Sequence, residues 1–168
     1  MNLNKIDTSS RFDKKETILI KRLLQHYLPK NIRDKITNDL FIKIVKKDFS
    51  QFSKELYLNK KELKEMYSCG MNFGIHGNYH LWWENQNEHV VKKEIDEPIK
   101  FFKNMLNKKD KISVCYPYGS FNKKVLSLIK SRNDISFALS TKVNNINKLN
   151  LQKEKLFYPR FDANDFKR

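Results

Sequence analysis

The sequence predicts an α/β fold in which helices and strands alternate, preceded by a helical arm. Three observations carry this prediction: the helical periodicity of residues 16–46, a change of pattern near Leu56, and the short apolar strands that alternate with helices after it. Strands separated by helices at this spacing indicate a parallel sheet or barrel, whose active site lies at the strand carboxyl ends. We therefore divide the chain into residues 1–55, a helical arm or insertion, and residues 56–168, the α/β domain.

The arm is predicted to contain two amphipathic helices. Residues 16–27 and 32–46 each place apolar side chains on one face, and Pro29 separates them because proline disfavours helix at the residue before it. Residues 48–56 are short and mixed in character, and we interpret them as a connection. The arm carries no catalytic signature.

Residues 56–168 are predicted to alternate between helices and strands. Asn59 can cap a helix with Glu62 three residues on, and Gly70 offers the left-handed stop. The longest amphipathic helix is expected over Glu88 to Leu106, with a kink at Pro98. The remaining expected elements are strands at 71–75, 112–116, 136–140 and 157–161 and a helix at 122–130.

The composition argues against several classes of function. The formal charge of +15 comes from lysines spread along the whole chain, with no zinc-finger spacing, RNP-type strand or helix-turn-helix, so we do not expect nucleic-acid binding. No apolar run reaches the roughly 18 residues of a membrane span, and no apolar leader is found, which predicts a cytoplasmic location by default. Cys69 and Cys115 make no metal or disulfide spacing and are interpreted as small core residues.

Two histidines follow the first predicted strand. His76 comes directly after Ile75, and His80 lies four residues further on, with Gly77 between them. Two imidazoles at this spacing can bind one divalent metal if the backbone turns correctly, and a glycine permits an unusual backbone there. On spacing alone, a pair of surface or half-buried histidines is the favoured interpretation.

Two later strands end in further polar segments. The Tyr-Pro-Tyr-Gly sequence at 116–119 can point a backbone N–H at a developing oxyanion, or it can be an ordinary proline-glycine turn. Arg160 and Asp162 end the last strand, where a surface salt bridge is the simpler interpretation. Because parallel strands end at one edge, all these segments are expected to gather on one rim.

In this order and spacing, the segments resemble the NodB-homology polysaccharide deacetylases, also called family-4 carbohydrate esterases. Residues 76–80 are similar to the family's H-[ST]-x-x-H motif, and residues 115–122 to its Y-P-Y-G-x-Y-[ND] loop. Residues 139–143 resemble its T-T strand end, and residues 158–162 its L-P-R-[IL]-D close. The resemblance covers roughly two-thirds of the chain.

The resemblance implies a partial (β/α) barrel of the NodB type and a metal-dependent hydrolase that removes N- or O-acetyl groups from an acetylated polysaccharide or oligosaccharide. His76 and His80 match the family's metal-binding histidines, and Tyr118 matches the residue whose backbone N–H helps to bind the oxyanion. Arg160 and Asp162 match polar residues of the closing motif. The expected cofactor is a divalent metal, zinc in the first place.

The sequence departs from the family at the acidic residues. Family members begin with a strand ending in T-F-D-D-G, whose aspartates are the general base and the third metal ligand, and no such segment is found here. Asp13 lies in a partial match to this segment, and we interpret Asp13 as a helix cap. In the histidine motif, Gly77 replaces the Ser or Thr that family members usually carry. We therefore expect a truncated deacetylase that is inactive alone and holds its metal weakly, unless an upstream chain supplies the missing strand.

A second function is consistent with the aromatic residues near these motifs. A non-catalytic glycan-binding pseudoenzyme or remnant would keep an aromatic groove in which rings stack on sugars, although the tryptophan pair also fits a packed loop lid. The candidate substrate-binding residues are Tyr79, Trp82, Trp83, Tyr116 and Tyr118.

Overall fold

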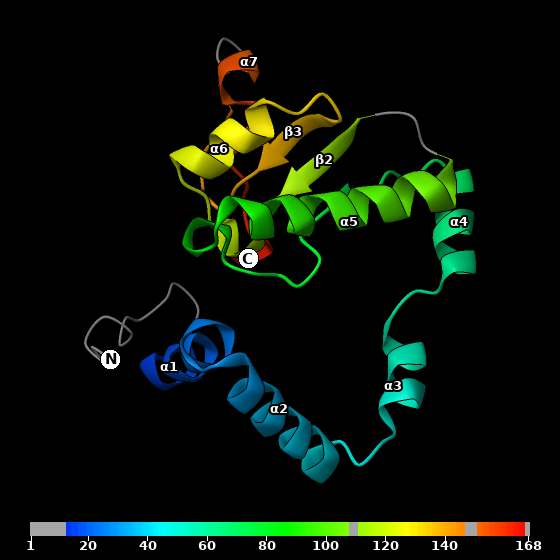
Figure 1. Ribbon diagram of the computed structural model, residues 1–168, viewed down its shortest axis with the longest axis vertical. Helices are drawn as coiled ribbons and strands as arrows, with labels where there is room; N and C mark the ends of the chain where they lie inside the picture. Colours follow the sequence, from blue (N-terminus) through cyan, green and yellow to red (C-terminus); the bar gives the residue numbers. More distant parts are fainter. Residues whose placement is uncertain (1–12, 108–110, 147–150, 167–168) are drawn as a thin grey trace. The chain divides into compact units, whose positions relative to one another are not determined.

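The protein is described by a computed structural model that covers residues 13–107, 111–146 and 151–166 (Figure 1). The chain divides into two compact units, Met1–Leu58 and Asn59–Arg168, which we call the helical unit and the sheet unit. Each unit is described by itself. Within the described ranges, no helix combines the length and the apolar character that crossing a membrane requires.

The helical unit contains the two helices predicted for the arm. α1 (Lys15–Arg22) continues into a π-helical turn, η2 (Leu23–Tyr27), and α2 (Lys30–Ile44) follows. Pro29 stands at the start of α2, where its missing N–H costs no helical hydrogen bond. Asp13 does not cap α1, because Lys14 holds the cap position and the Asp13 carboxylate pairs with Lys21 at 2.6 Å.

The segment interpreted as a connection is a helix, α3 (Phe49–Leu56). Its start is fixed by Asp48, whose carboxylate accepts hydrogen bonds from the backbone N–H groups of Ser50 and Gln51. The Phe41 ring of α2 stacks on Phe49 with ring centroids 4.2 Å apart. Phe41 also meets Phe52 of α3 edge to face, with ring centroids 5.1 Å apart. An N-cap and two aromatic contacts thus accompany a helix whose apolar pattern is too short to recognise.

The sheet unit is built on three parallel strands in the order β1-β2-β3. They are β1 (Gly74–Ile75), β2 (Ile112–Cys115) and β3 (Ile135–Leu139). Figure 1 shows the arrows of β2 and β3 side by side and pointing the same way. The first predicted strand is thus reduced to two residues, while the next two lie where they were expected.

The last predicted strand, 157–161, is reduced to a single parallel bridge between Leu139 and Tyr158. The Tyr158 N–H donates to the Ala138 carbonyl at 2.9 Å, and the Ser140 N–H donates to the Tyr158 carbonyl at 2.8 Å. These bonds still hold the chain beside β3, so the segment after Tyr158 is delivered to the same edge of the sheet.

Helices connect the strands as the sequence predicts. α4 (Lys60–Ser68) begins with a capping box, in which Asn59 accepts from the Glu62 N–H at 3.0 Å and the Glu62 carboxylate accepts from the Asn59 N–H at 2.7 Å. Gly70 follows in the left-handed region with φ +85°. α5 (Glu88–Leu106) runs through Pro98 without interruption. The other elements are α6 (Lys123–Lys130), α7 (Leu151–Glu154), and the 3₁₀ turns η3 (Trp83–Asn85), η4 (Pro117–Gly119) and η6 (Ala163–Asp165).

The core of the sheet unit packs α5 and α6 against the strands. Tyr116 and Trp83 meet edge to face with ring centroids 5.8 Å apart. The core residues with at most 1% of their surface exposed are Trp83, Ile95, Ile112, Val114, Tyr116, Ile129 and Ala138. The cysteines lie outside this group: Cys69 is exposed and Cys115 is half-buried, so their interpretation as core residues is wrong.

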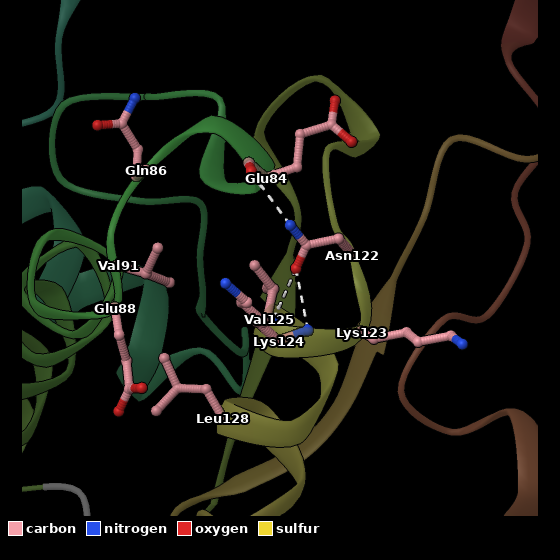
Figure 2. Close-up of a pocket in the computed structure, with 9 residues that line it drawn as sticks. All are labelled: Glu84, Gln86, Glu88, Val91, Asn122, Lys123, Lys124, Val125 and Leu128. Carbon is pink, nitrogen blue, oxygen red and sulfur yellow. Dashed lines mark hydrogen bonds between the residues drawn. The ribbon is translucent and has the colours of Figure 1, made fainter.

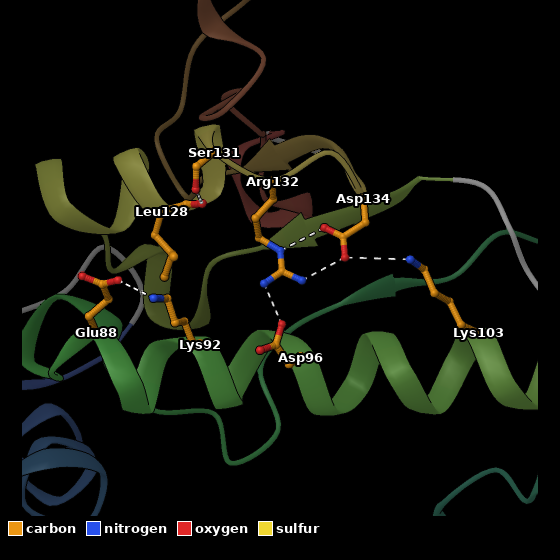
Figure 3. Close-up of polar contacts among 8 residues, drawn as sticks. All are labelled: Glu88, Lys92, Asp96, Lys103, Leu128, Ser131, Arg132 and Asp134. Atoms are coloured by element: carbon orange, nitrogen blue, oxygen red, sulfur yellow. Dashed lines mark hydrogen bonds and ion pairs between the residues drawn. The ribbon is translucent and has the colours of Figure 1, made fainter.

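An ion-pair network joins α5 to the segment before β3 (Figure 3). The Arg132 guanidinium donates to Asp96 at 2.6 Å and, through two nitrogens, to Asp134 at 2.9 and 2.8 Å. Lys103 approaches Asp134 at 3.8 Å. The hydrogen bonds from Arg132 hold the pKa of Asp134 below its usual value, against the opposing effect of partial burial.

Candidate active site

The carboxyl ends of the strands carry the candidate residues. Because the strands are parallel, His76 after β1, Tyr116 after β2 and Ser140 after β3 start from one edge of the sheet. The His76 ring reaches across to the next strand, and its Nδ1 lies 2.7 Å from the Cys115 carbonyl oxygen. The His80 ring turns back toward it, so that the two Nε2 atoms lie 2.9 Å apart.

The hydrogen bonds define how the two imidazoles are protonated. A carbonyl can only accept, so Nδ1 of His76 carries a proton, and in the neutral ring its Nε2 presents a lone pair. The neighbouring Nε2 of His80 then donates its proton to that lone pair. The pair therefore meets nitrogen to nitrogen, with His76 oriented by a backbone carbonyl.

This geometry fits two ligands of a divalent metal. With Zn–N bonds of about 2.0–2.1 Å, two nitrogens on one tetrahedral ion lie roughly 3.3 Å apart, close to the separation of the pair. Donation of the other ring N–H to a backbone carbonyl is the usual outer support of a metal-binding histidine. Across residues 13–107, 111–146 and 151–166, however, no group of three or more His, Cys, Asp and Glu side chains is placed to hold a metal. The described residues therefore provide two candidate ligands of a metal site but not a complete set.

The pKa values of the two histidines shift in opposite directions. Hydrogen bonding to Cys115, through its thiol and its backbone, raises the pKa of His76 despite partial burial. Burial and the positive charge of His76 lower the pKa of His80, and Glu94 opposes them. His76 is therefore the first of the pair to take up a proton as the pH falls.

Tyr118 meets His80 edge to face. Its backbone is in the left-handed region with φ +57°, and its ring centroid lies 4.4 Å from that of His80. Gly119 follows with φ +68° and packs so closely that a Cβ there would lie 2.1 Å from Oγ1 of Thr141. The Pro-Tyr-Gly turn thus packs closely against the residues that follow β3.

The closing segment contributes Arg160, whose charge acts on His76 and Cys115. Its Nε donates to the Ser140 carbonyl at 2.8 Å. Burial raises the pKa of the Cys115 thiol, but hydrogen bonding to His76 and the charge of Arg160 lower it by more. Asp162 is exposed, and its backbone N–H donates to the Asp165 carboxylate at 2.7 Å. The structure therefore brings Arg160 to the histidine pair, and Asp162 is not part of a metal-binding group.

The predicted sugar-binding aromatics separate into two sets. Tyr79 is 71% exposed, and Trp82 is half-buried beside Tyr118, with ring centroids 5.1 Å apart. Trp83 and Tyr116 are fully buried in the core, and the Tyr116 hydroxyl donates to the Leu156 carbonyl at 2.7 Å. Burial also raises the pKa of Tyr116 well above its usual value. These two rings offer no face to a sugar.

Sequence reasoning did not find Glu94, which lies on α5 and accepts hydrogen bonds from the backbone N–H groups of Tyr79 and Leu81. One signal was present in the sequence. Glu94 falls between Val91 and Ile95 on the apolar face of the predicted helix, where an acid is unexpected.

A separate hollow of about 350 Å³ lies between α5 and the start of α6 (Figure 2). The Asn122 amide donates to the Glu84 carbonyl at 3.1 Å, and its oxygen caps α6. The residues that line the hollow are Glu84, Gln86, Glu88, Val91, Asn122, Lys123, Lys124, Val125 and Leu128. Neither histidine is among them, so this hollow is distinct from the candidate active site.

A comparison of sequences agrees with the class of protein that the parallel sheet and the histidine pair at its edge indicate. The sequence matches the family model described as polysaccharide deacetylase over residues 28–133, which is more than half of the chain. The chain therefore belongs to the polysaccharide deacetylase family. No curated protein matches it.

A solved structure supports the predicted fold class. The chain resembles the Streptococcus pyogenes deacetylase PplD, determined in complex with acetate, with a TM-score of 0.54 and 24% sequence identity. The likeness covers 61% of this chain and 43% of PplD, so this chain corresponds to less than half of that protein. The predicted partial α/β fold of the NodB type is confirmed.

Proposed function

We propose that the chain contributes the histidine side of a metal-dependent deacetylase that removes acetyl groups from a glycan. The observation that carries the proposal is the meeting of His76 Nε2 and His80 Nε2 at 2.9 Å at the carboxyl edge of a parallel sheet. We assign the activity to residues 56–168 and treat residues 1–55 as an arm or insertion, a division that the boundary at Leu58 supports.

The chain's own residues then take distinct roles. His76 and His80 would hold the ion, with His76 kept in the correct tautomer by the Cys115 carbonyl. A divalent ion, with zinc expected, would polarise the acetyl carbonyl and activate water. The backbone N–H of Tyr118 is the candidate donor to the oxyanion. Arg160, anchored on Ser140, supplies a fixed positive charge beside the pair, and Asp162 is the carboxylate of the closing motif.

The site needs a carboxylate from elsewhere. In the part of the chain that the structure describes, β1 pairs with β2 alone, and its second edge can accept another parallel strand. A strand added there would end at the rim that holds His76. We propose that such a strand, from an upstream segment or another chain, brings the third metal ligand and the general base.

A metal titration with and without a strand peptide tests this function. Calorimetry with Zn²⁺ and acetate release from acetylated glucosamine oligomers should give weak binding and no measurable activity for the chain alone. A peptide carrying an apolar strand and two aspartates should restore both. His76→Ala or His80→Ala should abolish the restored binding, whereas His89→Ala, at an exposed histidine of α5, should not. Hydrolysis by the unaided chain would overturn the need for an added acid.

The aromatic surface supports a second candidate, metal-independent glycan binding. Tyr79 is exposed and Trp82 lies beside Tyr118, which gives a sugar ring an apolar surface on which to stack. This alternative predicts that Trp82→Ala weakens the binding of acetylated glucosamine oligomers while His76→Ala leaves it unchanged. Loss of glycan binding on chelation of metal would contradict it.

A further inference from the structure

Glu94 is a carboxyl group buried in the core of the sheet unit. Its side chain is on the inner face of α5, and 1% of the residue is exposed. A buried acid is costly unless hydrogen bonds satisfy it. The partners of Glu94 therefore indicate what this burial achieves.

Both partners belong to the loop that carries the histidines. Oε1 accepts from the Tyr79 N–H at 2.9 Å, and Oε2 accepts from the Leu81 N–H at 3.3 Å. These donors stand on either side of His80. On the third side, a Cβ added to Gly77 would lie 2.8 Å from Oε2, so the glycine makes room for the carboxyl group. The carboxyl group thus fills the inside of the turn from Gly77 to Leu81.

The turn needs such support because its backbone is unfavourable. His80 has φ +56°, a left-handed conformation that is uncommon for residues other than glycine. Conformations of this kind persist when the surrounding contacts hold them. A second contact comes from the same helix, where Glu97 accepts a hydrogen bond from the Asn78 amide. α5 thus holds the loop at two points one helical turn apart.

We propose that Glu94 is a positioning residue for the histidine pair. By accepting from the N–H groups on both sides of His80, it holds that residue in the left-handed conformation that brings its Nε2 to His76. The inference rests on the proposed function only in taking a divalent metal as the ligand of the pair. The hydrogen bonds themselves are made by the chain without it.

Nuclear magnetic resonance of the two imidazoles tests the proposal without metal. Glu94→Gln keeps the shape but turns one acceptor into an NH₂ that faces an N–H. At a pH above the pKa of both imidazoles, the wild-type full chain should show His76 and His80 as opposite tautomers. Glu94→Gln should remove the contact between the two Nε2 atoms. His80 should then exchange between its two tautomers, and its ring nitrogen signals should be averages of the two.

Two variants of α5 separate positioning from stability. Ile95→Val weakens the core beside Glu94 but leaves the hydrogen bonds from the loop to Glu94 in place, and Glu88→Gln makes the same chemical change at an exposed site. Both should keep the wild-type imidazole signals. If Glu94→Gln does not fold, Glu94→Asp, which keeps the carboxyl group on a shorter side chain, replaces it and should shift the His80 signals. Wild-type imidazole signals in a folded Glu94 variant would overturn the inference.

Zn²⁺ titration of the same proteins with the strand peptide supplies the second readout. Loss of an outer support of this kind weakens metal binding by about 10–100-fold, and that is the expected effect of Glu94→Gln. If wild type binds no zinc, the proposed function fails and the imidazole signals alone decide the role of Glu94. If wild type binds zinc and Glu94→Gln binds it equally, the positioning role fails and the proposed function stands.

Discussion

The two units have helices of similar pattern and very different burial. In the helical unit, Ile18 is the one buried apolar residue among those described, and Ile44 of α2 is 70% exposed. In the sheet unit, Ile95 of α5 is fully buried and Ile99 is 4% exposed. The same periodicity thus predicts a helix in both units, while only the sheet unit covers the apolar face. Packing, and not helix formation, decides where a substitution is costly.

The largest expected effect uses matched isoleucines of the two units. Ile95→Ala should lower the free energy of unfolding by about 2–5 kcal/mol, because it leaves a cavity between α5 and the sheet. Ile44→Ala should change it by less than about 0.5 kcal/mol. Urea unfolding followed by far-ultraviolet circular dichroism measures this, because that signal reports the helices of both units. Equal effects of the two substitutions would contradict the difference in burial.

Two glycines of the sheet unit separate crowding from backbone strain. Gly119→Ala should cost about 2–4 kcal/mol, because the new Cβ meets Thr141 as well as an unfavourable φ. Gly70→Ala meets no atom within 4 Å and should cost only about 1 kcal/mol, from its φ of +85°. The same urea titration compares them. A Gly119→Ala variant no less stable than Gly70→Ala would show that the Thr141 contact relaxes easily.

Breaking an ion pair should also cost more stability in the sheet unit than in the helical unit. Arg132→Ala should cost about 1–2 kcal/mol at neutral pH, because it removes charged hydrogen bonds to Asp134 and Asp96 from a partly buried position. Lys47→Ala, which breaks an exposed pair with Glu55, should cost about 0–1 kcal/mol.

The stability that Arg132→Ala removes should depend on pH, and the direction of this dependence follows from the pKa of Asp134. The pKa of Asp134 in the folded protein is below its ordinary value of 3.8, so the stability it contributes is present above that value and is lost as the pH falls through the folded pKa. The difference in melting temperature between wild type and Arg132→Ala should therefore shrink below about pH 3.8. A difference that is constant from pH 7 to pH 3 would show that Arg132 acts through packing alone.

The sequence predicts those features that depend on local signals. The capping box at Asn59, the left-handed stop at Gly70 and the long amphipathic α5 each follow from residues within a few positions of one another. The length of β1 and the single bridge at Tyr158 do not, because backbone pairing depends on segments far apart in the chain. A short helix such as α3 is also missed, because its signal is a cap and not a period.

The site shows the same limit. The strand-end rule brings His76, His80 and Tyr118 to one rim before any geometry is known. The rule does not indicate which aromatic side chains are buried, so it could not separate Trp83 from Trp82. It also gives no reason to connect Glu94 with a loop that lies before it in the sequence, since that contact exists only once α5 has packed on the loop.

The smallest expected effect compares the helix caps of the two units. Asn59→Ala removes the capping box of α4, which packs against α5, and should lower the free energy of unfolding of the sheet unit by about 1 kcal/mol. Asp48→Ala removes the matching cap of α3, whose helix buries no residue, so the loss should appear as local fraying. Hydrogen exchange distinguishes the two outcomes, because Asp48→Ala should speed exchange at Ser50 and Gln51 and leave α5 unchanged. Faster exchange throughout the sheet unit in Asp48→Ala would show that the two units unfold together.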